Sequence, residues 1–304
     1  MVKMSRYSLN NLQKSYADSK SLRTTGEGAD VTAAAISETD VTFRKTESGG
    51  LRARLYRPTG AAVAAVVDVH GGAWTSGDRT MNVAIARQLA ANGIAVLSLD
   101  FRMPPEAAYP VTVSDVAAGI RWMKTHASDV GTDTGRVGIL GTSSGGHLAL
   151  LLAIRPTDER YAGPAEAGAP DSTIPFAVLC WPVSDPVARY QMVRERGTTK
   201  LVDAHHAFWG DEATMTEGSP YAIIARGAAE KLPPLLIVQG TNDDNLTADM
   251  QQRLTEAYRA HGGSAELAIF PGEVHGFIGR DPASAASRDA LDRIAAFIRS
   301  AATR

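Results

Sequence analysis

The segment that most constrains this chain is residues 141–145, which read Gly-Thr-Ser-Ser-Gly. It follows the apolar run 136–140 and leads into 145–154, a stretch rich in leucine and alanine that favours a helix. A serine between two glycines at such a junction is typical of a nucleophile elbow, in which the serine lies at a sharp and strained strand-to-helix turn. We therefore predict that Ser143 is presented as a nucleophile between a buried strand and a helix.

The composition is that of a globular protein with room for a large core. Hydrophobic residues make up 44% and charged residues 21% of the 304 positions. The 31 basic and 33 acidic residues leave a net charge of −2, which gives no reason to expect nucleic acid or an anionic membrane as a partner. A homodimer is compatible with this composition.

Cysteine usage and the first residues bear on the cellular compartment. Cys180 is the single cysteine, so an internal disulfide is excluded, and its apolar surroundings predict a buried strand thiol. The N-terminus lacks the apolar region of a secretory signal, and the apolar runs are too short to cross a bilayer. These features predict a cytoplasmic protein.

From residue 41 onwards, strand and helix patterns alternate. A hairpin is expected over 41–45 and 51–57. Further strands are expected at 61–69, 94–99, 136–140, 176–181, 235–239 and 265–270, and helices at 82–92, 111–126, 145–154, 248–261 and 285–302. Near-continuous apolar strands separated by helices predict an α/β fold with a mostly parallel central sheet covered by helices on both faces.

Two segments stand outside this alternation. Residues 1–40 are polar, with Leu9, Leu12 and Tyr16 at helical spacing, and are either a loosely attached leader or part of a cap. Residues 183–231 show no strand pattern, and an insertion of that length is more often a lid or binding segment than an idle loop. We expect a cap in this region.

A serine nucleophile needs a base, and the base needs an orienting acid. In nucleophile-elbow enzymes these follow in the order serine, acid, histidine. His275 lies just after the last strand pattern, in a loop containing glycines, and is the predicted base; Asp243, which follows the strand 235–239, is the predicted acid, with Asp244 as the alternative. Of the other downstream histidines, His147 is expected to be structural, and His205 and His206 either to line the pocket or to face solvent; His261 does not follow the last strand pattern.

A developing oxyanion needs N–H donors that are already in place. The segment 70–74, His-Gly-Gly-Ala-Trp, follows the strand 61–69 and has the glycines that such a loop requires. We predict Gly72, Ala73 and Ser144 as the N–H donors, and a structural, hydrogen-bonding role for His70. No phosphate-binding loop, dinucleotide fingerprint or zinc-ligand spacing is present in the sequence, so neither a metal nor another cofactor is expected.

With these motifs in order, the chain resembles the α/β-hydrolase superfamily, and within it the hormone-sensitive-lipase-like and acetyl-esterase-like serine carboxylesterases. The resemblance begins at about residue 41. It rests on 70–74, 100–106 with Tyr109-Pro110, 141–147, the two turns at Asp243 and His275, and the segments 208–210 and 218–220. Thr142, Ser144 and Ala73 depart from the commonest pattern and are similar to the acetyl-esterase and kynurenine-formamidase side of the family.

The resemblance implies a catalytic domain over 41–304, with a cap formed by 1–40 and 183–231 over the acyl pocket and structural roles for Asp100 and Arg102. It implies hydrolysis of small carboxylic esters with short acyl chains through an acyl-enzyme. Hydrolysis of an amide or formamide is the alternative that keeps the same machinery. A non-catalytic ligand-binding relative is disfavoured, because Ser143, Asp243 and His275 are all present.

Overall fold

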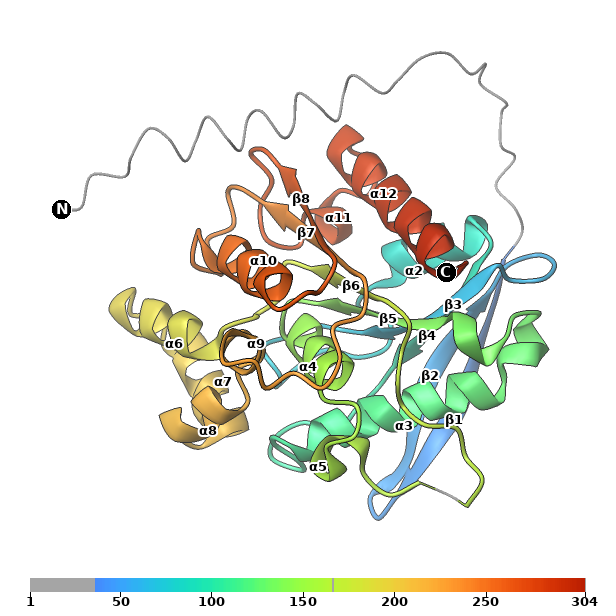
Figure 1. The fold of residues 1–304 in the computed structure, drawn as a ribbon, viewed down its shortest axis with the longest axis horizontal. Helices are drawn as coiled ribbons and strands as arrows, with labels where there is room; N and C mark the ends of the chain where they lie inside the picture. Colours follow the sequence, from blue (N-terminus) through green and yellow to red (C-terminus); the bar gives the residue numbers. More distant parts are fainter. Residues whose placement is uncertain (1–35, 166, 304) are drawn as a thin grey trace. The chain divides into compact units, whose positions relative to one another are not determined.

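A computed structural model describes residues 36–165 and 167–303 (Figure 1). Within this part, eight strands form one sheet in the order β1-β2-β4-β3-β5-β6-β7-β8. Strands β1 and β2 pair antiparallel, as do β2 and β4, and all later neighbours pair parallel. The strands are β1 (Ser37–Thr46), β2 (Gly49–Arg57), β3 (Ala64–Val69), β4 (Ile94–Leu99), β5 (Val137–Thr142), β6 (Ala177–Cys180), β7 (Leu235–Gly240) and β8 (Ala265–Phe270).

Helices cover both faces of this sheet. Helices α2 (Val83–Ala91) and α12 (Ala285–Ala301) pack together on one face, while α3 (Val111–Thr125), α4 (Ser144–Ile154) and α10 (Met250–Ala260) lie on the other (Figure 1). The short helices α5 (Glu159–Ala162) and α11 (Phe277–Arg280) lie in connections. The predicted α/β fold is confirmed.

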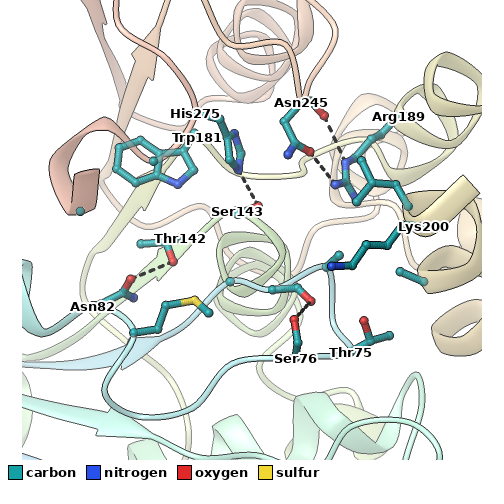
Figure 2. A pocket seen from close by; sticks show the side chains of 18 of the residues that line it. Thr75, Ser76, Asn82, Thr142, Ser143, Trp181, Arg189, Lys200, Asn245 and His275 are labelled. Carbon is teal, nitrogen blue, oxygen red and sulfur yellow. Dashed lines mark hydrogen bonds between the residues drawn. The ribbon is translucent and has the colours of Figure 1, made fainter. Parts of the chain in front are cut away.

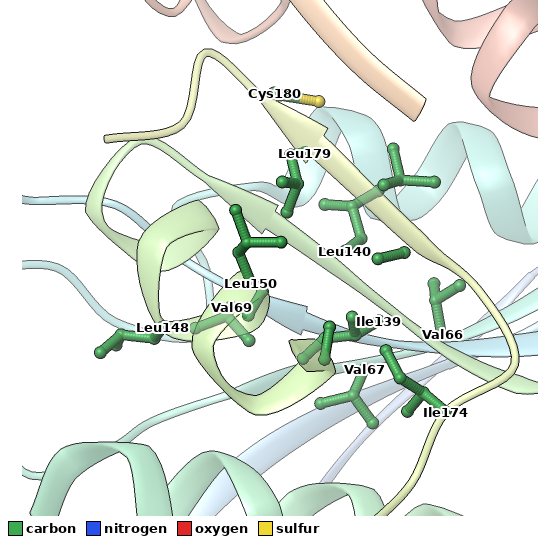
Figure 3. Packing of buried hydrophobic residues seen from close by; sticks show 14 of the residues in the cluster. Val66, Val67, Val69, Ile139, Leu140, Leu148, Leu150, Ile174, Leu179 and Cys180 are labelled. Carbon is green, nitrogen blue, oxygen red and sulfur yellow. The ribbon is translucent and has the colours of Figure 1, made fainter. Parts of the chain in front are cut away.

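The core explains why the strands read as continuous apolar runs. Every residue of β3, β4 and β5 is buried, as expected for parallel strands covered on both faces. Helix α4 is buried along its whole length, and its leucines pack against β3, β5 and β6 (Figure 3). Burial of each such side chain contributes about 1.5–3 kcal/mol to the stability of the fold. Ser143, which precedes α4, is therefore attached to a firmly packed helix.

Several strand boundaries differ from the sequence prediction, and three of the differences have a clear physical reason. Strand β1 begins at Ser37, four residues earlier than expected, because its polar first residues belong to an exposed edge strand without apolar alternation. Strand β3 begins at Ala64 and not at Ala61, since Ala62 N donates to Val130 O and Val63 N to Gly93 O, both outside the sheet. Strand β6 stops at Cys180, because the next residue has a φ of 42°.

The insertion over 183–231 is helical. It contains α6 (Pro186–Glu195), α7 (Thr199–Trp209), α8 (Glu212–Glu217) and α9 (Pro220–Ala225). The predicted helical spacing at Leu9, Leu12 and Tyr16 lies outside the described residues, as does most of the segment 1–40. In the part that the structure describes, none of the helices has the length and apolar character needed to cross a membrane.

Candidate active site

Ser143 occupies the turn between β5 and α4 with a strained backbone. Its φ of 52° and ψ of −119° lie in a region that residues with a Cβ rarely adopt, at a cost of about 1–3 kcal/mol. Two hydrogen bonds hold the turn: Ser143 N donates to Cys180 O at 3.0 Å, and Val183 N donates to Ser143 O at 3.0 Å. The strained strand-to-helix turn predicted at Ser143 is therefore present, and the neighbouring strand β6 helps to hold it in place.

The glycines around Ser143 are required by close backbone approach. A Cβ at Gly145 would lie 2.2 Å from both Val69 O and His70 O, and one at Gly141 would lie 2.5 Å from Gly145 O. The loop after β3 thus touches the first turn of α4. This contact brings the segment 70–74 beside Ser143.

The structure brings Ser143, His275 and Asp243 together in one hydrogen-bonded chain. His275 Nε2 lies 2.9 Å from Ser143 Oγ, and His275 Nδ1 lies 2.8 Å from Asp243 Oδ2. These residues follow β5, β8 and β7, and parallel strands place their carboxyl ends at one edge of the sheet. His275 thereby meets Asp243, 32 positions away, and Ser143, 132 positions away.

Asp243 is fixed by more than its histidine partner. Gln239 Nε2 donates to Asp243 Oδ2 at 2.9 Å, and Asn245 N donates to Asp243 Oδ1 at 2.9 Å. Burial by itself raises the pKa of Asp243, but the hydrogen bonds from His275, Gln239 and the Asn245 amide outweigh it, so the pKa is lowered overall. Asp244, the alternative acid, is exposed, and its backbone carbonyl accepts from Arg196.

The loop after β3 turns sharply and leaves donors beside the serine. The φ angles of Gly72, Ala73 and Trp74 are all positive, at 103°, 53° and 64°. A Cβ at Gly72 would lie 1.9 Å from Ser76 O, so only glycine fits there. Among the described residues, the N–H groups of Gly72, Ala73 and Ser144 have no hydrogen-bond acceptor. They are free to bind an oxygen of a ligand.

Trp74 anchors this loop, and its role was not predicted from the sequence. Trp74 N donates to Ser144 Oγ at 3.1 Å, and its indole Nε1 donates to His147 Nδ1 at 3.2 Å. His147 Nε2 in turn donates to Gly218 O at 2.9 Å. Burial lowers the pKa of His147 to about 3, so it is neutral at physiological pH, in keeping with its predicted structural role.

Three further histidines near the site form no hydrogen bond with Ser143, His275 or Asp243. His70 is buried, stacks on Phe101 with ring centres 4.2 Å apart, and pairs through Nδ1 with Gly71 O at 2.7 Å, which agrees with its predicted structural role. His205 is buried against Trp74, and His206 is exposed with Nε2 2.7 Å from Tyr190 Oη. Neither of these two contacts Ser143 or His275.

The remaining predictions near the site have simple structural outcomes. Cys180 is buried, as predicted, and burial raises the pKa of its thiol. Asp100 binds the backbone and guanidinium of Arg79, and Arg102 pairs with Asp115, both structural contacts. No cluster of histidine, cysteine, aspartate or glutamate suited to a metal ion occurs among residues 36–165 and 167–303.

A cavity of about 400 Å³ opens above Ser143. Trp181, Asn82 and Thr142 lie on one side of the serine, while Arg189, Lys200 and Asn245 lie on the other (Figure 2). The complete lining is Gly71, Gly72, Ala73, Thr75, Ser76, Met81, Asn82, Ala84, Ile85, Thr142, Ser143, Trp181, Arg189, Lys200, Leu201, Ala204, Asn245, His275, Gly276 and Gly279. Helices α6 and α7 supply part of it, so the insertion does reach the site.

Comparison with known proteins agrees with this geometry. A family model described as alpha/beta hydrolase fold matches residues 66–279. The chain belongs to the α/β-hydrolase family. The expected resemblance to the hormone-sensitive-lipase-like esterases of this family is confirmed, because the relatives and the structural neighbours bear esterase names.

Two relatives and one solved structure illustrate the similarity. Carboxylic ester hydrolase LipN of Mycobacterium tuberculosis is 30% identical over 76% of this chain and 62% of LipN. Ethyl acetate hydrolase of Pseudomonas putida is 26% identical over 79% of this chain and 75% of that enzyme. The hyperthermophilic esterase of Pyrobaculum calidifontis has a TM-score of 0.71 and 25% identity, covering 89% of this chain and 87% of its own. The chain spans between 49% and 62% of the length of the first curated relatives that it matches.

Proposed function

We propose that this α/β-hydrolase is a serine carboxylesterase that hydrolyses small esters through an acyl-enzyme. The observation that carries the proposal is the hydrogen-bonded chain Ser143–His275–Asp243 at the floor of the cavity. A serine hydroxyl needs this arrangement of base and orienting acid to become a nucleophile. The esterase names of the relatives support the same reaction class.

In the first half of the proposed reaction, Ser143 Oγ attacks the ester carbonyl carbon while His275 Nε2 takes the hydroxyl proton. The carbonyl oxygen becomes an oxyanion, and the N–H groups of Gly72, Ala73 and Ser144 bind it. The tetrahedral intermediate then breaks its bond to the alcohol oxygen, and the alcohol leaves with the proton from His275. Asp243 holds the imidazole in the correct tautomer and stabilises its charged form.

In the second half, a water molecule attacks the acyl-enzyme carbonyl and gives its proton to His275. The bond to Ser143 Oγ breaks, the serine regains the proton, and the carboxylic acid leaves. A cavity of about 400 Å³ lies toward the small end of the usual range for ligand sites, which favours short acyl chains.

The test is ester turnover by Ser143→Ala beside the wild-type protein. We expect kcat to fall at least about 10,000-fold, as for loss of other serine nucleophiles. The wild-type rate is then measured over aryl esters of increasing acyl length, with an N-formyl anilide included. Rates that fall steeply beyond short acyl groups support the proposal, whereas retained turnover in Ser143→Ala, or preference for the formanilide, contradicts it.

A further inference from the structure

The cavity carries two positive side chains that the proposed chemistry does not use. Arg189, from α6, is 1% exposed, and Lys200, from α7, extends toward the cavity from the rim (Figure 2). No acidic side chain is among the described residues that line this cavity. The α6–α7 side of the site is therefore positively charged.

Arg189 is an unusual buried cation because it has no carboxylate partner. Its Nε donates to Asn245 O at 3.2 Å and its Nη2 to Asn245 Oδ1 at 2.6 Å, both neutral acceptors. Its Nη1 has no hydrogen-bond partner among the described residues. Buried charges are normally paired, because an unpaired one loses its hydration without compensation.

The charge of Arg189 persists in this environment. Burial lowers the pKa of Arg189 to about 10, which still leaves the guanidinium charged at neutral pH. Asp243 acts on it electrostatically, but the oxygens of Asp243 are occupied by His275, Gln239 and the Asn245 amide. The face of the Trp74 ring, 5.6 Å from the guanidinium carbon, gives only partial compensation.

Lys200 adds a second positive charge on the same side. Among the described residues it forms no ion pair, and its amino group lies toward the loop after β3 in Figure 2. On the other side of Ser143 lie Trp181, Asn82 and Thr142, none of which carries a charge (Figure 2). Both positive side chains of the lining thus lie on one side of Ser143.

We propose that the physiological ester carries a free carboxylate, which Arg189 and Lys200 bind on the α6–α7 side of Ser143. The inference rests on the proposed esterase function and names its substrate class. A carboxylate would give Nη1 the acceptor that it lacks and would neutralise the buried charge. Since Nη1 has almost no exposed surface in this structure, the contact requires the guanidinium to turn towards the cavity as the ligand binds.

Two pairs of esters test whether charge is recognised, and on which side of the ester bond. In the first pair, 4-acetoxybenzoate carries the carboxylate on the alcohol side, and its methyl ester is the neutral match. In the second pair, monomethyl glutarate carries it on the acyl side, and methyl hexanoate is the neutral match. We expect the wild-type protein to have the higher kcat/KM for the charged member of one pair.

The variant Arg189→Met keeps a similar volume and removes the charge. For the charged member of the preferred pair we expect kcat/KM to fall roughly 10- to 100-fold more than for the neutral member, the usual worth of hydrogen bonds to a charged group. Lys200→Met, at an exposed position, is expected to give a smaller loss of the same kind. Arg194→Met, on the same helix but paired with Glu212 away from the cavity, is the matched control and is expected to change neither member.

Equilibrium binding separates this inference from the proposed function. Titration of the Ser143→Ala variant with monomethyl glutarate and with 4-acetoxybenzoate, each beside its neutral match, is expected to show tighter binding of one charged ester, lost when Arg189→Met is added. Equal affinity within both pairs, or equal loss of both members in Arg189→Met, would overturn the inference while ester turnover stands. Absence of ester turnover in the wild-type protein would overturn the proposed function, and the binding result would still decide the charge recognition.

Discussion

The indole Nε1 of Trp74 donates to Nδ1 of His147, so the loop after β3 is tied to the helix that follows Ser143. His147 Nε2 extends the link to Gly218 O in the inserted segment. A single neutral imidazole thereby connects the loop after β3, helix α4 and the turn between α8 and α9. The Trp74 indole, the His147 imidazole and the Gly218 carbonyl all belong to buried residues. Losing a hydrogen bond there is costly, because the group left behind has no water to bind.

We therefore expect His147→Phe to lower both stability and kcat. The change leaves Trp74 Nε1 without an acceptor and Gly218 O without a donor, at a cost of about 1–3 kcal/mol for each buried group. Urea unfolding at pH 7 and ester turnover measure the two effects. His261→Phe, at an exposed helix end, is the control and is expected to stay close to wild type. Wild-type stability in His147→Phe would contradict the structural role.

The sequence order was sufficient to bring Ser143, Asp243 and His275 into one site, because each follows an apolar strand and parallel strands end at the same edge. The Trp74–His147 link was not predictable, since it joins a loop to a helix 73 positions away through side-chain packing. The first residues of helices α6 and α9 could be predicted from the sequence. Asp185 and Ser219 each precede a proline and cap the helix that follows, an arrangement typical of helix starts.

The burial of Arg189 could not be predicted from the sequence. Nothing in its local sequence distinguishes it from the exposed Arg194 and Arg196 on or next to the same helix. Its burial depends on where α6 packs against Trp74 and Asn245, both far away along the chain. The positive charge of the cavity could therefore be inferred only from the structure.

The neighbouring acids Asp243 and Asp244 give a matched pair of variants. In Asp243→Asn the amide cannot accept from His275 Nδ1–H as a carboxylate does, so the imidazole loses its orientation and its stabilised charged form. We expect kcat for ester hydrolysis to fall roughly 1,000- to 10,000-fold, as for loss of the acid in other triads. Asp244→Asn, with an exposed side chain, is expected to remain within about twofold of wild type, since surface substitutions change little. Equal effects of the two variants would contradict the assignment of Asp243.

Asp68 on β3 makes the stability depend on pH in a defined direction. Burial raises the pKa of Asp68 to about 6, and hydrogen bonds from Ser98 and Asn82 only partly oppose this. The folded state thus holds a proton that the unfolded chain, with its ordinary pKa of 3.8, releases, so this carboxyl lowers stability as pH rises between about 4 and 6.

In Asp68→Asn this cost disappears, while the amide oxygen can still accept from Asn82 and the Ser98 hydroxyl can reverse its role. We expect the unfolding free energy of the variant to exceed that of wild type by up to about 3 kcal/mol at pH 7.5, and by much less near pH 4.5. Urea unfolding at both pH values measures the difference, with the exposed Asp203→Asn as control. A difference that is the same at both pH values would show that the ionisation of Asp68 is not its cause.

A substitution at Gly145 tests how closely the loop after β3 and the first turn of α4 must approach each other. In Gly145→Ala the new methyl group would lie 2.2 Å from both Val69 O and His70 O, and these are backbone atoms that cannot rotate away. Either the loop after β3 or the first turn of α4 must shift, and both carry N–H groups proposed to bind the oxyanion. We expect a loss of about 1–3 kcal/mol in unfolding free energy, as for overpacking, and a fall in kcat larger than the rise in KM, because the shift affects the transition state most. The matched control is Gly279→Ala, where a Cβ meets no atom within 4 Å and stability is expected to match wild type. If Gly145→Ala retained both wild-type stability and kcat, the loop and the helix would have to be farther apart than the structure places them.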